Sequence, residues 1–313
     1  MREPVLPLLR CPRCKAERTL TLTGRAGDER EVREGDLACG ACGAEFDVAD
    51  GIMNLLHDPP EFVEREAAGL DRFAEVMRAD GWDRERILAL PDIDVGYWPD
   101  QRRAMDTILD KAGFEPGRRI VDVGSNTCWA SNIFAREGLD VIALDIARAE
   151  MQGLLTADYF LETGEVYFER LLSVMYDPAL ASETMDYVFC CEVLHHNDRA
   201  NLRQTLREMY RVLRPGGRLF IVNEPMRFPL RPKLRHAEEV AEFEGNEHVH
   251  FFHQYYRAAR AAGFEVARPW PRADSPSRAA RLLREVRRAG RWAWYHVIAG
   301  DRALALDCTK PSG

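Results

Sequence analysis

The stretch RIVDVGSNT, residues 119–127, decides the fold of this chain. A short apolar strand there ends at Gly124 and gives way to a helical pattern over residues 128–137. A second apolar strand, residues 140–144, ends in Asp145, about twenty residues after the glycine. Near-continuous apolar runs separated by helical patterns are typical of a parallel sheet that is buried on both faces. The sequence therefore predicts an α/β protein.

Later segments extend this pattern. Residues 185–192 (MDYVFCCE) predict a further strand, and LRPGG at 213–217 stops a helix before the strand at 218–222. The remaining expected elements are a helix over 252–262 and strands over 264–266 and 303–308. In sheets of this kind a ligand binds at the carboxyl ends of the strands, near the point where the strand order reverses. The residues that follow these strands are therefore the first candidates for a binding site.

The bulk properties limit the classes of function. A chain of 313 residues is long enough for one large domain and one small one. No apolar run approaches the roughly 20 residues that span a bilayer, and the N-terminus lacks a signal-peptide pattern, so we expect a cytoplasmic protein. A net charge of −8 disfavours nonspecific nucleic-acid binding without excluding a local basic patch.

Half of the eight cysteines fall in two CxxC pairs, Cys11 with Cys14 and Cys39 with Cys42. Two such pairs supply the four thiolates of a tetrahedral Zn²⁺ site, and a unit of about 45 residues has too little core to be stable without a metal. A redox dithiol is the weaker alternative, since it needs only one pair. The other cysteines are expected to be small buried apolar residues: Cys128, Cys190, Cys191 and Cys308.

The composition predicts three segments. Residues 1–57 form a zinc-ribbon-like domain, residues 58–118 a helical linker or lid, and residues 119–313 the α/β domain, with a basic helical insertion near 270–300. Within that insertion, residues 278–295 combine an arginine-rich helix face with trailing aromatic residues. Such a helix either packs on the core as an ordinary solvated helix or makes a peripheral contact with a membrane or polyanion. The sequence leaves both open.

The order of these segments resembles the class I S-adenosylmethionine-dependent methyltransferases. The resemblance rests on DVGSN (122–126), on Asp145, and on CCEVLHH (190–196) followed by LRPGG (213–217), and it covers about 190 residues. It implies a Rossmann-like, mostly parallel seven-stranded sheet with helices on both faces. The N-terminal unit resembles the small zinc ribbons that accompany tRNA and protein methyltransferases, and the N-terminal ribbon of rRNA guanine methyltransferases.

The resemblance also implies a site for S-adenosylmethionine. Asp122 and Gly124 match the family's acid and first glycine, whereas Asn126 and Cys128 stand where further glycines would be. Asp145 is placed to accept hydrogen bonds from ribose hydroxyls, a device that nicotinamide enzymes share, but the later segments do not resemble dehydrogenases. The cofactor-binding candidates are Asp122, Gly124, Ser125, Asn126, Asp145, Ile146, Met175 and Glu192.

Methyl transfer from a sulfonium is an in-line displacement, so positioning the reactants does most of the catalysis. A base is needed only where the acceptor must lose a proton, and histidine suits that role because its pKa lies near neutrality. The catalytic candidates are His196, Glu224 and His248. For each, a capping or packing role is the alternative. A metal site around residues 247–250 is disfavoured because the HExxH arrangement is absent.

The leading hypothesis is therefore a methyltransferase for a small molecule, a sugar or glycan intermediate, or a natural product, acting on oxygen or nitrogen. The alternative is an RNA base methyltransferase of rRNA or tRNA, which the ribbon favours. The segment after the strand at 185–192 lacks the Asn-Pro-Pro-Tyr type of clamp that several nucleic-acid enzymes use for exocyclic amines. A regulatory subunit that binds the cofactor without catalysis is a third hypothesis.

Overall fold

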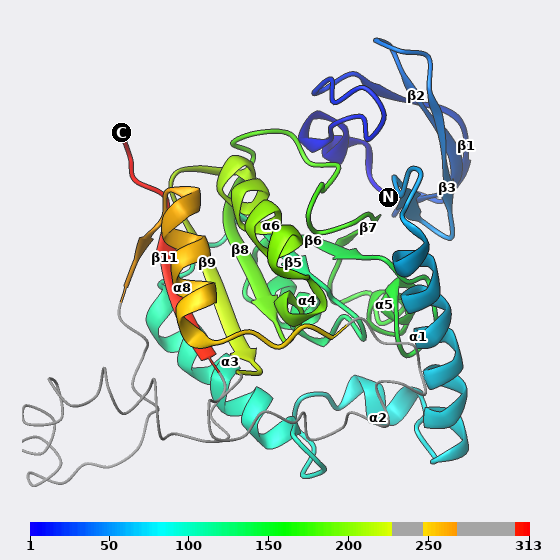
Figure 1. Cartoon of the computed structure of the whole chain (residues 1–313). Coiled ribbons are helices and arrows are strands. Elements are labelled where there is room, and N and C mark those ends of the chain that lie inside the picture. Colours follow the sequence, from blue (N-terminus) through cyan, green and yellow to red (C-terminus); the bar gives the residue numbers. More distant parts are fainter. Residues whose placement is uncertain (227–246, 268–303) are drawn as a thin grey trace, which may run out of the picture.

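The computed structural model describes residues 1–226, 247–267 and 304–313. In this part of the chain the strands join into one eleven-stranded sheet, in the order β1-β2-β3-β4-β7-β6-β5-β8-β9-β11-β10 (Figure 1). The strands are β1 (Leu20–Gly27), β2 (Val32–Cys39), β3 (Glu45–Ala49), β4 (Ile52–Asn54), β5 (Arg119–Val123), β6 (Asp140–Asp145), β7 (Glu169–Leu172), β8 (Met185–Cys191), β9 (Leu213–Glu224), β10 (Glu265–Val266) and β11 (Leu304–Thr309).

Seven of these strands form the sheet that the sequence predicts. Strands β7, β6, β5, β8 and β9 are parallel neighbours, and β11 and β10 complete the sheet as antiparallel strands. The strand order reverses between β5 and β8, so the carboxyl ends of these two strands define the expected ligand crevice. The Rossmann-like, mostly parallel architecture is confirmed.

Helices cover both faces of this sheet (Figure 1). They are α1 (Glu61–Ala79), α2 (Arg84–Leu88), α3 (Trp98–Ala112), α4 (Trp129–Arg136), α5 (Ala157–Leu161), α6 (Arg199–Val212) and α8 (Phe252–Ala262), with short 3-10 turns η1 (Glu3–Leu8), η2 (Leu154–Thr156) and η3 (Leu194–His196). The helices predicted at residues 128–137 and 252–262 correspond to α4 and α8. The loop before α3 ends at Tyr97, and Gly113, with φ 62°, ends that helix in the left-handed region where glycine is favoured.

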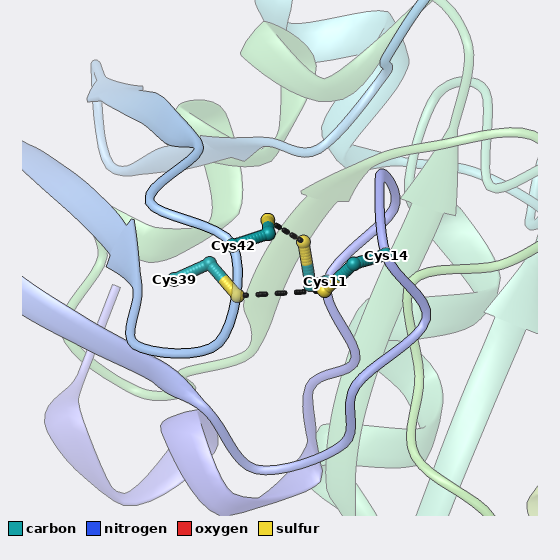
Figure 2. Close-up of side chains that lie close together, drawn as sticks. All are labelled: Cys11, Cys14, Cys39 and Cys42. Carbon is teal, nitrogen blue, oxygen red and sulfur yellow. Dashed lines mark hydrogen bonds between the residues drawn. The ribbon is translucent and has the colours of Figure 1, made fainter.

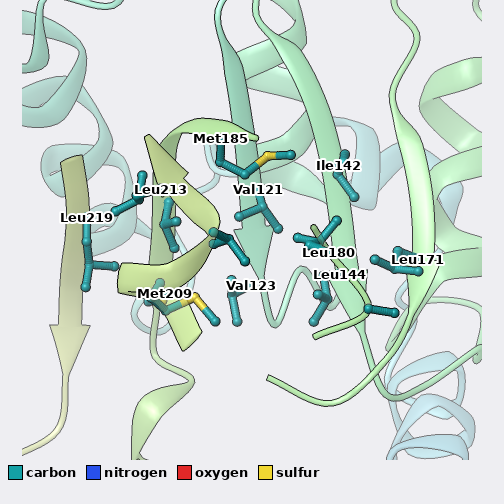
Figure 3. Packing of buried hydrophobic residues seen from close by; sticks show 14 of the residues in the cluster. Val121, Val123, Ile142, Leu144, Leu171, Leu180, Met185, Met209, Leu213 and Leu219 are labelled. Carbon is teal, nitrogen blue, oxygen red and sulfur yellow. The ribbon is translucent and has the colours of Figure 1, made fainter. Parts of the chain in front are cut away.

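The two faces bury two separate hydrophobic clusters. Strand β5 shows the division, because Val121 and Val123 belong to the cluster under α6 and α8, whereas Ile120 belongs to the cluster under α3, α4 and α5. Figure 3 shows Val121, Val123 and neighbouring side chains of the first cluster packed together. Because side chains of successive residues point to opposite faces, burial on both faces explains why Ile120, Val121 and Val123 are all apolar.

The N-terminal hairpins continue the central sheet. Strand β4 pairs in parallel with β7, with Ile52 opposite Arg170 and Asn54 opposite Leu172. On the other side of the ribbon, Arg10 contacts Asp177 and Glu208 through its guanidinium at 2.6 and 3.0 Å. The ribbon therefore shares backbone hydrogen bonds with the α/β region, and the proposed boundaries at residues 57 and 118 remain predictions.

Two sequence expectations remain: the basic helical insertion and the absence of a membrane-spanning segment. The basic insertion near 270–300, including residues 278–295, lies outside the described residues. Among the helices that the structure describes, none combines the length and the apolar composition needed to cross a bilayer.

Candidate active site

The turn after β5 keeps three left-handed positions although only the first is a glycine. Gly124, Asn126 and Cys128 have φ angles of 69°, 44° and 57°. A Cβ atom on Gly124 would lie 2.2 Å from a methyl carbon of Val193, so a side chain is sterically excluded there. Asparagine tolerates this region better than most residues, whereas a left-handed cysteine is uncommon. The turn thus forms as the sequence predicts, with backbone exposed to an incoming ligand.

Asp145, at the tip of β6, holds this turn in place. Its Oδ2 accepts a hydrogen bond from the backbone nitrogen of Asn126 at 2.8 Å, and its Oδ1 accepts from those of Ile146 and Ala147 at 2.8 and 2.9 Å. Burial raises the pKa of Asp145, and the three backbone donors oppose that shift. The carboxylate therefore reaches the cofactor turn by direct hydrogen bonding.

Asp122 and Thr127 lie on the other side of the turn. The Ser131 hydroxyl donates a 2.6 Å hydrogen bond to Asp122, and burial raises the pKa of this acid to about 7. Ser125, also a predicted cofactor residue, is buried beside them. The hydroxyl oxygen of Thr127 is buried and has no hydrogen-bond partner among the described residues. A buried hydroxyl without a partner is costly unless a ligand or water completes it.

Glu192 follows β8 and faces the same turn. The amide nitrogen of Gln101 donates to its Oε2 at 2.6 Å. Burial, and then the charge of Glu224, raise the pKa of Glu192 to about 8, while the Gln101 bond opposes them. The oxygen of Gln101 also accepts from Asn223 at 2.7 Å and contacts the Cys191 thiol at 3.0 Å. Helix α3 is thereby tied to the ends of β8 and β9.

Glu224, predicted as catalytic, is fully buried and lines neither of the cavities described below. Its Oε1 accepts hydrogen bonds from the backbone nitrogens of Val193 and Leu194, both at 2.8 Å. Its Oε2 contacts the backbone nitrogen of His195 at 3.1 Å and the Nδ1 of that residue at 3.0 Å. This geometry positions the η3 turn and leaves no face of the carboxylate toward an acceptor.

His196 lies at the end of η3, directly against helix α1. Its Nδ1 is 2.5 Å from the Oε1 of Glu66. Burial lowers the pKa of His196, but the hydrogen bond and charge of Glu66 outweigh it and leave this pKa above its usual value. His248, by contrast, is exposed and lines neither cavity, although its backbone nitrogen donates to the carbonyl of His195 at 2.6 Å. The structure therefore brings one of the three catalytic candidates to the site.

Two adjoining cavities surround the turn. The larger, of about 600 Å³, lies between the turn and helices α1 and α3, and aromatic side chains of Phe73, Trp82, Tyr97, Trp98 and Trp129 form part of its wall. The smaller, of about 100 Å³, is lined by Asp145, Ile146, Met175, Glu66 and His196 among others. Both cavities include Gly124, Asn126 and Glu192 in their walls. All eight predicted cofactor residues line one or both.

Sequence reasoning did not find Glu66, Gln101 or Thr127. A signal existed for the first, because Glu66 falls on the buried stripe of α1 between Val63 and the later apolar residues, where a charge is unusual. Gln101 gave no comparable signal, since a polar residue in a helix is ordinary until its partners are known.

The four cysteines of the ribbon converge, as Figure 2 shows. Cys11 and Cys14 come from the loop after η1, Cys39 ends β2, and Cys42 lies in the turn that follows it. The Sγ–Sγ distances are 3.8 Å for Cys11 with Cys42 and 3.7 Å for Cys14 with Cys39, and all four sulfurs lie within 4.8 Å of one another. Ligands about 2.3 Å from a tetrahedral zinc ion would stand about 3.8 Å apart, so the cluster fits this metal.

The other cysteines follow the expectation in most cases. Cys128, Cys190 and Cys308 are buried, and Cys191 is partly buried.

Comparison with known proteins supports the same region. Residues 121–221 match a family model described as a methyltransferase domain. The chain is 32% identical over 121 residues to the ubiquinone biosynthesis O-methyltransferase of Aeromonas salmonicida, covering 37% of this chain and 48% of that protein. It is 28% identical over 153 residues to the methyltransferase GfsG of Streptomyces halstedii, covering 44% and 52%. The chain thus spans about half the length of these curated relatives.

Solved structures show the same fold at low identity. Geranyl diphosphate methyltransferase, in complex with GPP and sinefungin, has a TM-score of 0.52 and 16% identity, covering 80% of this chain and 98% of that one. The [4+2]-cyclase SpnF has a TM-score of 0.51 and 19% identity, covering 70% and 84%. One fold therefore serves two chemistries, and function must come from the site. The family match and the sequence relatives together support a methyltransferase domain that includes residues 121–221.

Proposed function

We propose that the chain transfers a methyl group from S-adenosylmethionine to the oxygen or nitrogen of a small molecule. The observation that carries this proposal is the His196–Glu66 pair, which lines the same cavity as Asp145 and the cofactor turn. A histidine there can remove the proton that the acceptor must lose.

The residues around the turn fit the donor. Backbone at three left-handed positions leaves room for close approach, and the unpartnered hydroxyl of Thr127 offers a hydrogen bond to a polar group. Asp145 would hold ribose hydroxyls, and Met175 and Ile146 would give the adenine an apolar wall. When bound, the donor supplies an electrophilic methyl group on a positively charged sulfur. Glu192 would favour that charge once its carboxyl group is ionised.

His196 acts as the base in this proposal. Its Nδ1 is engaged by Glu66, which fixes the ring and leaves Nε2 as the nitrogen that accepts a proton. Since Glu66 raises the pKa of His196, the imidazole holds the removed proton more strongly. Glu224 contributes by fixing the η3 turn from which His196 projects, and we assign it a positioning role.

The walls of the larger cavity favour an aromatic or otherwise apolar acceptor over a sugar. Five aromatic side chains, from the segment before β5 and from α4, bound this space. Aromatic walls suit a flat organic molecule, and the polar side chains that share the lining, including Asp80, Gln152 and Glu192, can orient it. Two relatives are named as methyltransferases of ubiquinone biosynthesis and of demethylmenaquinone, which supports acceptors with a quinone-type ring.

Methyl-labelled donor incubated with the full chain and a fractionated cell extract tests the proposal. We expect label in organic-soluble small molecules, and its loss in His196→Ala without a loss of donor binding. Label in RNA would instead support the alternative suggested by the ribbon. Absence of label from every fraction would overturn methyl transfer. The fold alone does not guarantee that reaction, since it also occurs in the [4+2]-cyclase SpnF.

Donor binding is tested separately by calorimetry. Asp145→Ala should weaken affinity for S-adenosylmethionine by about tenfold or more, the loss of one to two hydrogen bonds to a charged group. Asp140→Ala is the matched control, because Asp140 begins the same strand and is exposed. Equal affinities of the two variants would remove the cofactor assignment of Asp145.

A further inference from the structure

A second cleft lies away from the donor site, between helices α6 and α8. It has a volume of about 350 Å³, and its wall includes Arg199, Arg203, Arg207, Arg257, His253 and Gln254. Figure 1 shows the two helices side by side on one face of the sheet. No acidic residue is among the described residues that line it.

The arginines form a row. Arg199, Arg203 and Arg207 are spaced by four residues on α6, so they share one face of the helix and rise about 6 Å per step. Arg257 approaches from α8. Like charges at this spacing destabilise a helix. The arginines of the row therefore repel one another, and a bound anion would offset this repulsion.

Several other surface arginines are paired. Arg78, Arg84 and Arg136 each meet a glutamate from another element: Glu150, Glu162 and Glu165. For the four arginines of the cleft, the described part of the chain provides no ion pair. The chain as a whole has a net charge of −8, so four arginines without an ion pair among the described residues are a local concentration of positive charge.

We propose that this cleft binds a small-molecule oligophosphate, that is, two or more phosphates joined in a chain. Guanidinium groups match phosphate oxygens with paired hydrogen bonds and stay charged at every physiological pH. The row extends about 12 Å from Arg199 to Arg207, which exceeds a single phosphate. The lining also carries Leu202, Ala258 and Ala261, and His253 is its one aromatic ring among the described residues, which favours a small oligophosphate over a nucleic-acid strand that needs a row of stacking rings.

The cleft is a site distinct from the proposed methyl-transfer centre. None of the residues that line the cleft lines either of the two cavities at the cofactor turn. Binding at the cleft does not depend on methyl transfer, and it can be measured without donor or acceptor.

Calorimetric titration of the full chain with tripolyphosphate tests this proposal. We expect binding at micromolar concentration, weakened tenfold or more by the double variant Arg203→Gln with Arg257→Gln, and at least tenfold weaker binding of orthophosphate. Arg260→Gln is the matched control, because Arg260 is exposed on α8 but does not line the cleft. Circular dichroism and melting temperature of each variant exclude unfolding as the cause.

Three results would overturn the proposal. One is the absence of tripolyphosphate binding by the wild-type chain. Another is an equal loss in the control variant, which would show nonspecific attraction to surface charge. The third is tighter binding of a single-stranded RNA decamer that the double variant abolishes, which would assign the cleft to a nucleic-acid backbone instead.

Discussion

A buried cation at the ribbon edge of the sheet, Arg170, is paired with carboxylates, whereas two acids at the centre, Asp122 and Glu192, have no cationic partner among the described residues. At the edge, Arg170 is fully buried on β7 and contacts the carboxylates of Glu31 and Asp158, the latter at 2.6 Å. At the centre, Asp122 and Glu192 accept hydrogen bonds from the neutral groups of Ser131 and Gln101. Both regions are buried, so the difference lies in the partners.

The pKa values reflect this difference. Burial raises the pKa of Glu31, but Arg170, the terminal amino group and Arg33 outweigh it, and the pKa of Glu31 lies below its usual value. At the centre, burial raises the pKa of Asp122 to about 7 and that of Glu192 to about 8. Paired charges hold two parts of the chain together, while acids without a cation keep the capacity to respond to one. We therefore expect the ion pairs of Arg170 to stabilise the fold, and Asp122 and Glu192 to respond to a bound ligand.

The largest effect is expected at the edge, from loss of metal. Purified protein should contain about one zinc per chain, and Cys39→Ser should lose it. Since a structural zinc site contributes folding free energy directly, we expect a loss of at least about 5 kcal/mol, which lowers the melting temperature by about 10 °C or more. Metal analysis and thermal unfolding measure the two outcomes.

Cys308→Ala is the control for this substitution. Cys308 is a buried thiol on β11 outside the cluster, so its variant should keep zinc and lose only about 1 kcal/mol of packing. Zinc retained at full occupancy in Cys39→Ser would show that the ribbon does not use these four thiolates.

The next largest effect is expected from loss of the ion pairs that Arg170 makes with Glu31 and Asp158. Arg170→Met should destabilise the chain by about 3 kcal/mol in denaturant unfolding, because Glu31 and Asp158 would lose their fully buried partner and keep only Arg33 and the terminal amino group. Arg136→Met removes the exposed pair with Glu165 and should change stability by less than about 1 kcal/mol. Similar values for the two variants would remove the distinction between edge and surface charges.

At the centre, the His196–Glu66 pair should affect rate without affecting donor binding. His196→Ala is expected to lower kcat by about 100-fold, the usual scale for a lost general base. Glu66→Gln should lower the pKa of His196, since it removes the hydrogen-bonded charge that raises it. A base must be deprotonated to act, so the acid limb of the kcat/KM profile should move to lower pH.

Glu64→Gln is the matched control on the same helix, because Glu64 is exposed. An unmoved pH profile in Glu66→Gln, or a parallel loss of donor affinity in His196→Ala, would give the pair a structural role only.

The central strands and the cofactor turn could be predicted from the sequence because each is specified by a short local pattern. The apolar run before Gly124 and the acid at Asp145 are each contained in a few residues, and Asn126, which stands where a further glycine would be, adopts a left-handed backbone with φ 44°. The pattern also placed Cys11 and Cys39 in one cluster, because paired spacings restrict where the chain can bring thiols together.

Contacts between distant segments could not be predicted in this way. The pairing of β4 with β7 joins residues separated by more than a hundred positions, and no local pattern specifies which edge strand a short strand selects. Glu66 reaches His196 from the helix of the predicted lid, and Glu224 was assigned to catalysis because its partners in η3 were unknown. Burial and pairing, which separate a positioning carboxylate from a reacting one, appear only when the whole chain is folded.

The smallest expected effect is a pH-dependent donor affinity that depends on Glu192. Its carboxyl group, with a pKa of about 8, is largely neutral at pH 6.5 and becomes anionic as the pH rises. A positively charged donor favours the ionised form, so the affinity for S-adenosylmethionine should increase several-fold between pH 6.5 and 8.5. The demethylated product lacks the sulfonium charge, and its affinity should change less. Calorimetry with both ligands on the wild-type chain and on Glu192→Gln measures the difference.

Asp122 titrates in the same range, with a pKa of about 7, and it remains in the Glu192→Gln variant. Any slope left in that variant therefore belongs to Asp122 or to His196. If the difference between donor and product persists unchanged in Glu192→Gln, the sulfonium does not lie near this carboxylate. The unpaired acids of the centre would then respond to some other cation, and the contrast with the paired edge would have to be explained by the acceptor instead.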